Sequence, residues 1–428
     1  MTIAIVGVGE TDYSWKDPRP VAALALAVLV SCVTTLNVGV LAVALAWIIG
    51  VYIGGIPVAT VMAGFPTQLF LTLTGMTLLF TAAQCNGTLD RLAHHAVRLC
   101  RGNRGVIPIM FFLIGAGLAS MGPGNIATAA IVAPMAMATA VRVRIPLFLM
   151  AIMVGNGANS GSLSPFAPTG IIVNGLMDRN GLGGYEVSTY LYNLGAHALV
   201  AFGGYFLFGG LKLFTAGPAA APAGASGPLE ADPPFEWRHW LTLAVIAALI
   251  LSVLFFNVNV GMGAFLASVV LVLSGAADDG EAIKRMPWRV IVMVCGVTVL
   301  IALLEKAQGI DLLVSLVARF STKDTVTGVV AFLTGIISVY SSTSGVVLPA
   351  FLPMVPGLAE QLGGASALGI ASAMNIGGHL VDVSPLSTIG ALCIAGAPVD
   401  ESRSLFNKLL VWGLSMSVVG ALLCWILF

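Results

Sequence analysis

Four short segments place glycine or proline beside serine, threonine and asparagine within otherwise apolar sequence. They are 120–125 (SMGPGN), 155–165 (GNGANSGSLSP), 341–345 (SSTSG) and 375–385 (NIGGHLVDVSP). Proline denies a helix one of its backbone hydrogen bonds, so a helix that contains such a segment is expected to break there. Carbonyl groups freed at a break can ligate a small cation, and the N–H groups at the start of a half-helix can hold an anion. The chemistry expected at these segments is therefore ion binding.

Hydroxyl and amide side chains in and beside these segments are the candidates for binding an anionic substrate. They are Asn125, Asn156, Asn159, Ser160, Ser164, Thr343, Ser344, Asn375, Ser384, Ser387 and Thr388. The candidates for binding a coupling cation are Ser120, Gly122, Gly124, Asn125, Gly157, Gly161, Ser162, Ser341, Ser342, Gly377 and Asp382. No Lys or Arg lies within the four segments, so cations that enter with the substrate are expected to supply the positive charge. Close helix packing by small residues is the alternative interpretation.

Asp382 is an acid in the middle of the fourth segment. Carboxylates at membrane depth are costly and are functional by default. Asp382 could coordinate a cation, carry a coupling proton, orient a neighbour, or cap the half-helix expected to begin near Leu386. His379 could shuttle protons near neutral pH, or it could be a satisfied interior histidine.

The composition predicts that a lipid bilayer surrounds these segments. The chain has 428 residues, of which 58% are hydrophobic and 9% charged, whereas soluble domains carry about 25% charged residues. Apolar runs long enough to cross a hydrocarbon core of about 30 Å recur along the chain. The six scattered cysteines form no CxxC pair, so they predict neither a cysteine metal site nor a disulfide framework. No cofactor is expected apart from Na⁺ as the coupling ion, which would bind at the hairpin tips. Net charge is zero and no stretch is basic enough to predict a nucleic-acid partner.

The chain repeats itself with a spacing of about 220 residues. Asn37-Val38-Gly39 recurs as Asn259-Val260-Gly261, and Ser164-Pro165 recurs as Ser384-Pro385. The segment between the halves is rich in Pro, Ala and Gly, as flexible linkers are. The predicted organisation is an N-terminal tail (1–20), a first repeat (21–214), a linker (215–237) and a second repeat (238–428).

Each repeat is expected to hold five transmembrane helices and one re-entrant hairpin. In the first repeat these are helices 21–36, 38–55 and 66–86, an amphipathic stretch 88–101, hairpin arms 106–121 and 125–141, a discontinuous helix 146–158 and 165–177, and a last helix 190–213. In the second repeat they are 238–256, 260–275 and 288–306, then 311–320, hairpin arms 325–340 and 345–360, a discontinuous helix 365–378 and 386–397, and 404–427. The first hairpin arm, from Ile107 to Ser120, is only roughly 21 Å long at 1.5 Å per residue. Five crossings are an odd number, so the second repeat must be inverted relative to the first.

Charge predicts the orientation in the membrane. With the linker in the cytoplasm, most Lys and Arg residues, Arg289 among them, lie on the cytoplasmic side, as the positive-inside rule requires. The expected protein is a multi-pass inner-membrane protein with a cytoplasmic linker and both termini on the periplasmic or extracellular side.

At these residues the chain resembles the malonate and dicarboxylate carrier family of the MatC type, within the ion-transporter superfamily that includes the divalent-anion/sodium symporters. The resemblance covers about residues 20–428. It is carried by 63–90 (AGFPTQLFLTLTGMTLLFTAAQCNGTLD), 122–134 (GPGNIATAAIVAP), 157–170 (GANSGSLSPFAPTG) and 381–398 (VDVSPLSTIGALCIAGAP), of which the last is the most specific. In that superfamily a Ser-Asn-Thr motif at each hairpin tip helps to bind sodium and carboxylate. Here its places are taken by Gly124-Asn125-Ile126 and Thr343-Ser344-Gly345, so only Asn125 keeps the motif's own residue.

The resemblance implies an all-α, homodimeric secondary transporter that works by an elevator mechanism. It would import a small dicarboxylate, malonate in the first place and a C4-dicarboxylate as the alternative, by symport with Na⁺ or, alternatively, H⁺. A membrane subunit of a transporter that depends on a soluble binding protein is a rival interpretation. An intramembrane enzyme is a remote one, because the sequence lacks a Ser/His, Asp/Asp or HExxH arrangement on facing helices.

Overall fold

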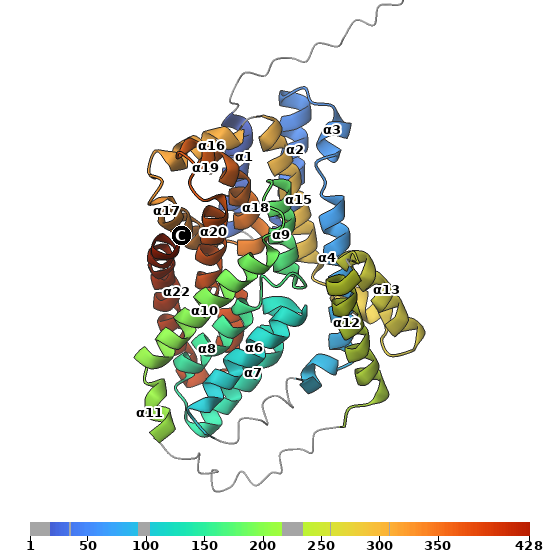
Figure 1. The fold of residues 1–428 in the computed structure, drawn as a ribbon, viewed down its shortest axis with the longest axis vertical. Coiled ribbons are helices and arrows are strands. Elements are labelled where there is room, and N and C mark those ends of the chain that lie inside the picture. Colours follow the sequence, from blue (N-terminus) through green and yellow to red (C-terminus); the bar gives the residue numbers. More distant parts are fainter. Residues whose placement is uncertain (1–17, 34–35, 93–102, 216–233, 257, 308) are drawn as a thin grey trace, which may run out of the picture.

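The computed structural model describes residues 18–33, 36–92, 103–215, 234–256, 258–307 and 309–428. These residues form helices and their connections and contain no strand (Figure 1). The expected all-α class is therefore confirmed. Residues 1–17 of the predicted tail, 93–101 of the amphipathic stretch and 216–233 of the linker lie outside the described residues.

The helices follow the predicted order with small shifts at their ends. The first half forms α1 (Pro18–Val33), α2 (Val38–Trp47) with η1 (Ile48–Ile53), α3 (Val58–Met62), α4 (Thr67–Cys85), α6 (Val106–Met121), α7 (Gly124–Val143), α8 (Leu147–Ser160), α9 (Pro168–Arg179), α10 (Glu186–Leu207) and α11 (Gly210–Thr215). The helix predicted at 190–213 is split into α10 and α11, because Gly209 adopts a φ of +87° that ends the first of them.

The second half continues with helices and short helical turns. It forms α12 (Trp237–Phe256), α13 (Val260–Leu273), α14 (Asp279–Arg285), α15 (Trp288–Lys306), α16 (Gly309–Ala318), α17 (Val326–Ser338), η2 (Thr343–Val347), α18 (Leu348–Phe351), η3 (Leu352–Met354), α19 (Val355–Gln361), α20 (Ala367–Leu380), η4 (Val381–Val383), α21 (Thr388–Ala395) and α22 (Val399–Leu427). The last helix begins at Val399 rather than at 404, directly after Pro398, a residue suited to the start of a helix.

Six helical segments of the described chain are long and apolar enough to cross a membrane. They are Val58–Cys85, Gly124–Val143, Trp288–Lys306, Thr343–Gln361, Ala367–Ala395 and Val399–Leu427, and several shorter apolar helices accompany them. On α22 the side chains of Leu414, Val418 and Leu422 are exposed, which is expected of a surface that faces lipid. The protein is a multi-pass membrane protein.

The Asn-Val-Gly sequence starts one helix in each half. The side chain of Asn37 caps α2 by accepting a hydrogen bond from the backbone N–H of Gly39, and Asn259 caps α13 by accepting one from Met262. Such caps satisfy donors that the first turn of a helix leaves without an intrahelical partner. The repeated motif therefore sets the first residue of two equivalent helices.

Two close helix crossings join the halves: α2 packs on α15, and α13 packs on α4. A Cβ atom built on Gly296 of α15 would lie 2.2 Å from the carbonyl oxygen of Gly39 on α2. One built on Gly75 of α4 would lie 2.4 Å from the carbonyl oxygen of Gly261 on α13. Glycine is thus required at each crossing, because any side chain would collide with the backbone of the other half.

A second pair of close glycine contacts joins α8 to α6 and α20 to α17. A Cβ atom on Gly157 of α8 would lie 2.5 Å from the carbonyl oxygen of Phe112 on α6, and one on Gly377 of α20 would lie 2.3 Å from that of Ala331 on α17.

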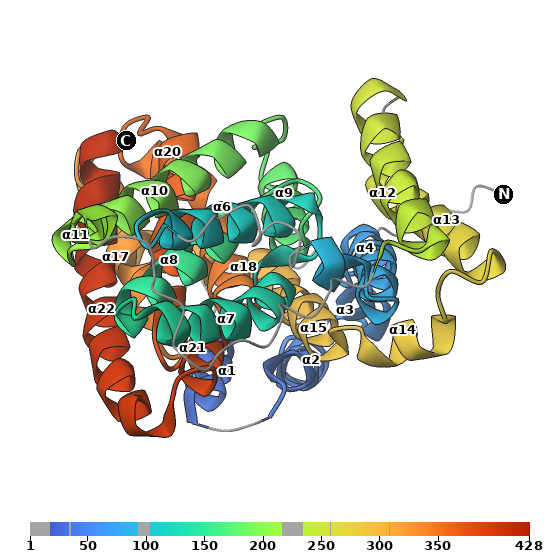
Figure 2. The same cartoon turned by 90° about the horizontal axis from the view of Figure 1, so that it is seen from below.

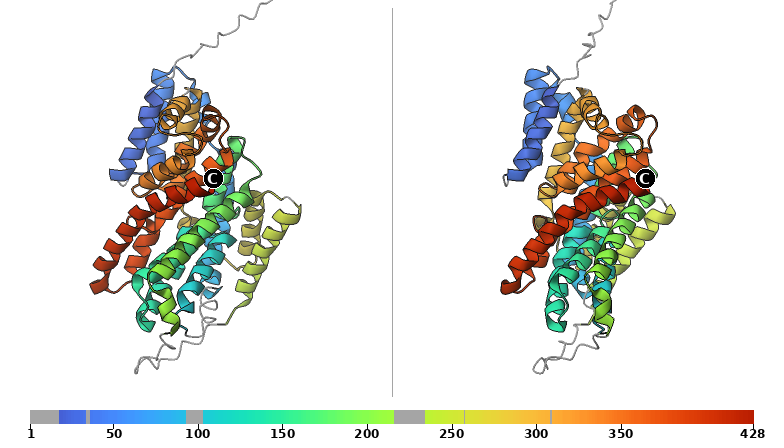
Figure 3. Two further views of the ribbon diagram at one scale, coloured as in Figure 1. Left: turned by 60° about the vertical axis from the view of Figure 1, so that its left-hand side comes forward. Right: turned by 90° about the vertical axis from the view of Figure 1, so that its left-hand side faces the viewer.

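We call α6, α7, α8, α10, α17, α20, α21 and α22 the hairpin group, and α1, α2, α4, α12, α13 and α15 the crossing group. Figures 2 and 3 show that α12 and α13 lie at one edge of the molecule and α22 at the opposite edge.

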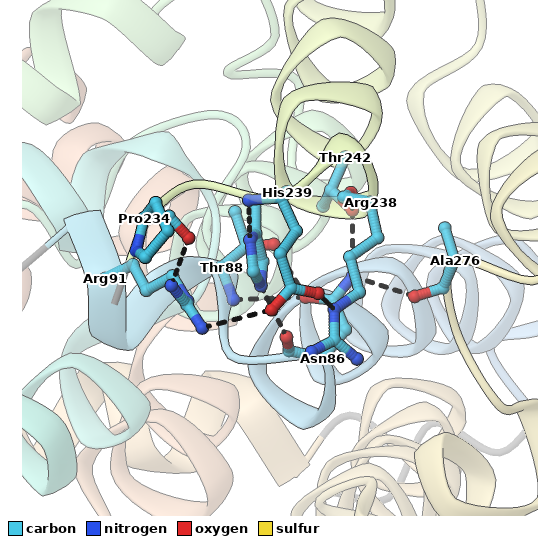
Figure 4. A network of polar contacts seen from close by, with 9 residues as sticks. Asn86, Thr88, Arg91, Pro234, Arg238, His239, Thr242 and Ala276 are labelled. Carbon is cyan, nitrogen blue, oxygen red and sulfur yellow. Dashed lines mark hydrogen bonds and ion pairs between the residues drawn. The ribbon is translucent and has the colours of Figure 1, made fainter. Parts of the chain in front are cut away.

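A polar network fixes the start of α12 to the end of α4 (Figure 4). The amide nitrogen of Asn86 donates to Oγ1 of Thr242 at 2.9 Å and to the carbonyl oxygen of Ala276 at 3.1 Å. Nε2 of His239 lies 3.1 Å from the carbonyl oxygen of Asn86, and its Nδ1 accepts the backbone N–H of Glu236 at 2.9 Å. The carbonyl can only accept, so this buried imidazole carries its hydrogen on Nε2. The network holds the two halves in register beside the linker.

Candidate functional site

A cavity of about 470 Å³ lies where the crossing group meets the hairpin group. Its volume is within the range of about 300–1,000 Å³ that is typical of small-molecule sites. The crossing group contributes Asn37, Val38, Arg289, Val290 and Met293. The hairpin group and its connections contribute Asn125, Ile126, Ser338 to Ser344, Val346, His379, Asp382 and Leu386 to Ile389.

Five helices begin at this cavity. The lining residues from their first turns or caps are Asn37 and Val38 of α2, Asn125 and Ile126 of α7, Arg289 and Val290 of α15, Ser342 to Ser344 of η2, and Ser387 to Ile389 of α21. The first turn of a helix presents N–H groups without intrahelical partners and the positive end of the helix dipole. Several such ends around one cavity make it a favourable place for an anion.

The loop after α17 together with η2, which we call the second tip, is tied to the second helix break. Oγ1 of Thr343 donates to Oδ1 of Asp382 at 2.9 Å and lies 3.2 Å from the carbonyl oxygen of Gly378. Ser387 caps α21, because its Oγ accepts the backbone N–H of Gly390 at 3.3 Å. The capping role considered for Asp382 is therefore wrong: Ser387 holds that position, and the Asp382 carboxylate accepts the hydroxyl of Thr343 in the second tip.

Residues 120–125, which join α6 to α7 and which we call the first tip, are tied to the first helix break in a comparable way. The amide nitrogen of Asn125 donates to Oδ1 of Asn159 at 2.8 Å, and Oγ of Ser164 donates to the carbonyl oxygen of Ser120 at 2.7 Å. Gly122 has a φ of +138°, and a Cβ atom there would lie 1.9 Å from the ring of Phe80. This glycine is required both for the turn and for contact with α4.

Some of the predicted substrate-binding residues line the cavity and others do not. Those that do are Asn125, Thr343, Ser344, Ser387 and Thr388. Asn156, Asn159, Ser160, Ser164, Asn375 and Ser384 are buried in or beside the two breaks, outside the lining. The structure therefore concentrates the candidates that can reach a ligand at the two tips and at the start of α21.

The buried candidates of the first break are bonded to α10, which the sequence did not indicate as part of the site. Nδ1 of His197 lies 2.9 Å from Oδ1 of Asn156, and the amide nitrogen of Asn193 donates to the carbonyl oxygen of Asn159 at 2.9 Å. Ser160 donates to the carbonyl oxygen of Gly157 in its own helix. These contacts give the residues a supporting role that holds the end of α8.

The predicted cation-binding residues divide similarly. Ser341, Ser342, Asp382 and Asn125 line the cavity, whereas Ser120, Gly122, Gly124, Gly157, Gly161, Ser162 and Gly377 do not. Oγ of Ser120 donates to the carbonyl oxygen of Ala116 at 2.6 Å. Ser162 and Ser384, one in each break, are buried, and their Oγ atoms have no hydrogen-bond partner among the described residues. An oxygen-binding ion would satisfy such hydroxyls.

Arg289 is the charged residue among the described cavity-lining residues that the sequence did not indicate as part of the site. In the sequence it is one of the basic residues that flank the membrane, and it lies outside the four segments. In the structure its exposed side chain lines the cavity from the first turn of α15. A basic residue in the first turn of an apolar helix was the available signal, and the sequence did not show which residues it would face.

Comparison with known proteins agrees with a transport function. Residues 19–162 match the family described as "Dicarboxylate carrier protein MatC N-terminus". The fold is similar to that in the crystal structure of the Alcanivorax borkumensis YdaH transporter, with a TM-score of 0.57 and 18% sequence identity over 86% of this chain and 87% of that chain. No curated protein matches the sequence significantly.

Both matches are to carriers or transporters, which are not enzymes. The family match falls within the first half, and the structural match covers most of both chains. The protein is thus a multi-pass membrane protein with the fold of a transporter, and its residues 19–162 match the N-terminal part of dicarboxylate carrier proteins.

Proposed function

We propose that this protein is a secondary active transporter that imports a small dicarboxylate by symport with a cation. The observation that carries the proposal is the cavity, which is lined by the first turns of five helices together with Arg289. This arrangement favours an anion over a neutral solute. The MatC match favours a dicarboxylate, with malonate as the first candidate and C4-dicarboxylates as the alternative.

Sodium is the favoured coupling ion in this proposal, and a proton is the alternative. Oxygen ligands suit a hard cation. The hydroxyls of Ser162 and Ser384 are buried without a partner among the described residues, one at each helix break. Asp382 beside the second tip brings a negative charge that a cation would balance, or that a proton would neutralise.

The proposed mechanism is an elevator movement of the hairpin group against the crossing group in a homodimer. Two inverted repeats would supply the symmetry, and the matched glycine crossings at Gly39 with Gly296 and at Gly75 with Gly261 support that arrangement. With Arg289 and Asn37 on the cytoplasmic side, as the charge distribution favours, the cavity opens toward the cytoplasm. A re-entrant path for each hairpin is part of the same proposal.

The proposal is tested by ligand binding to the purified full-length protein in detergent. Thermal unfolding is measured with malonate, succinate, acetate or no ligand, in sodium chloride and in choline chloride. A bound ligand raises the midpoint of unfolding by mass action, so the dicarboxylates should raise it in sodium more than in choline, and acetate should raise it least. Equal midpoints with all ligands in both salts would contradict the proposal.

A further inference from the structure

We propose that Arg289 forms a second carboxylate subsite on the crossing group, and that this subsite makes the cavity select substrates with two carboxylates. The first carboxylate is held on the hairpin-group side, by the Asn125 amide of the first tip and by the hydroxyls of the second tip and of the start of α21. The inference rests on the proposed transport function and names the residue that determines its specificity.

The position of Arg289 on α15 directs it to the cavity. Met293 lies one helical turn later, so the two side chains share one face of the helix. A Cβ atom on Gly345 of the second tip would lie 2.0 Å from Cε of Met293, so this face of α15 packs against the tip. Helical side chains lean toward the N-terminus of their helix, which places the guanidinium group beside the beginning of α15, where the cavity lies.

Asn37 holds Arg289 in place. Its amide nitrogen donates to the carbonyl oxygen of Arg289 at 2.9 Å, while its Oδ1 accepts the backbone N–H of Gly39. A Cβ atom on Gly39 would lie 2.3 Å from the carbonyl oxygen of Val292. The first turns of α2 and α15 therefore form one rigid unit, and Asn37 is a positioning residue for the arginine.

The charges around the cavity fit a ligand with two anionic ends. Among the described lining residues, Arg289 is the one Lys or Arg, and Asp382 is the one Asp or Glu. One carboxylate oxygen of Asp382 already accepts the hydroxyl of Thr343 in the second tip. The negative charge therefore lies on the hairpin-group side of the cavity, and Arg289 lies on the crossing-group side. A guanidinium group can bind a carboxylate through two parallel hydrogen bonds, which a single ammonium cannot do.

A substrate with one carboxylate would occupy the hairpin-group side and leave Arg289 without its ligand. Removing one hydrogen bond to a charged group lowers the affinity by roughly 10- to 100-fold. The wild-type protein should therefore prefer malonate to its monomethyl ester by about this factor, although the two ligands share the same carbon chain.

The test measures the dissociation constants of malonate and monomethyl malonate for the purified full-length protein by calorimetry, in the wild type and in R289Q, R289K and R285Q. Arg285 is the matched control, because it is exposed on α14, pairs with Glu281 at 3.3 Å and does not line the cavity. R289Q should raise the dissociation constant of malonate by roughly 10- to 100-fold and leave that of the monoester unchanged. R289K should lose part of this preference, and R285Q should lose none.

The outcomes separate this inference from the transport proposal. If R289Q keeps the wild-type ratio of the two dissociation constants, or weakens both ligands equally, the second subsite is overturned while the transporter proposal stands. If the wild-type protein binds neither ligand, the dicarboxylate proposal and the subsite are both overturned.

Discussion

Thr343 donates its hydroxyl hydrogen to Oδ1 of Asp382 over 2.9 Å, and this bond ties the second tip to the second helix break. Valine has nearly the shape of threonine but no hydroxyl, so Thr343→Val should release the tip and lower uptake about tenfold, as expected for loss of a hydrogen bond to a charged group. Thr334→Val is the matched control, because the buried Thr334 hydroxyl donates to Val330 in its own helix at 2.8 Å. Equal uptake by the two variants would show that the tie is dispensable.

Asp382→Asn separates the charge of this residue from its hydrogen bond. The amide oxygen can still accept from Thr343, but the negative charge is lost. We expect the cation concentration for half-maximal uptake to rise at least about tenfold, which corresponds to about 1.4 kcal/mol, while the yield of folded protein stays the same. A cation titration identical to that of the wild type would limit Asp382 to orienting the tip.

The two tips should both be essential. Asn125→Ala removes the bond to Asn159, and Ser344→Ala removes a hydroxyl that lines the cavity. Each change should abolish uptake without changing the elution of the protein on size exclusion.

Two controls accompany these variants. Asn180→Ala and Ser315→Ala remove side chains that, among the described residues, bond within their own helical turns, to Leu176 and to Leu312. They should transport normally. Normal uptake by both tip variants would refute the assignment of the tips to the binding site.

A substitution at a glycine crossing should lower the stability of the protein rather than its affinity for a ligand. In Gly296→Ala the new methyl group would meet the backbone of Gly39 at 2.2 Å, so we expect a loss of about 1–3 kcal/mol, as for other overpacked sites. In Gly117→Ala the methyl group would meet nothing within 4 Å, and the helix should gain up to about 1 kcal/mol. Thermal unfolding in detergent compares the two, and equal midpoints would mean that the crossing tolerates a side chain.

The positions of the helix breaks could be predicted from sequence because they depend on local chemistry. Gly161 follows the last turn of α8, and α9 begins at Pro168, a residue suited to the first turn of a helix. The Asn37 cap and the Ser387 cap are likewise decided within a few residues of the chain. Polar residues at such breaks were therefore the right places to search for the site.

The membership of the site could not be predicted in the same way. Arg289 reaches the cavity because α15 packs against α2 and the second tip, and each of these is distant from it in sequence. His197 and Asn193 lie in α10, outside the four polar segments, and their bonds to Asn156 and Asn159 exist only after α10 packs on α8. Which face meets which neighbour is a property of the tertiary fold, and the spacing of residue types does not encode it.

Dicarboxylate transport through this cavity is tested by uptake of labelled malonate into liposomes that contain only this protein. An inward sodium gradient, an inward proton gradient and no gradient are compared, with Ser344→Ala as the inactive reference. We expect malonate accumulation driven by the sodium gradient in the wild type and none in the variant. Accumulation driven by protons alone would transfer the coupling role from sodium to protons. No accumulation under any gradient would contradict a self-sufficient carrier and favour a transporter that requires a soluble binding protein.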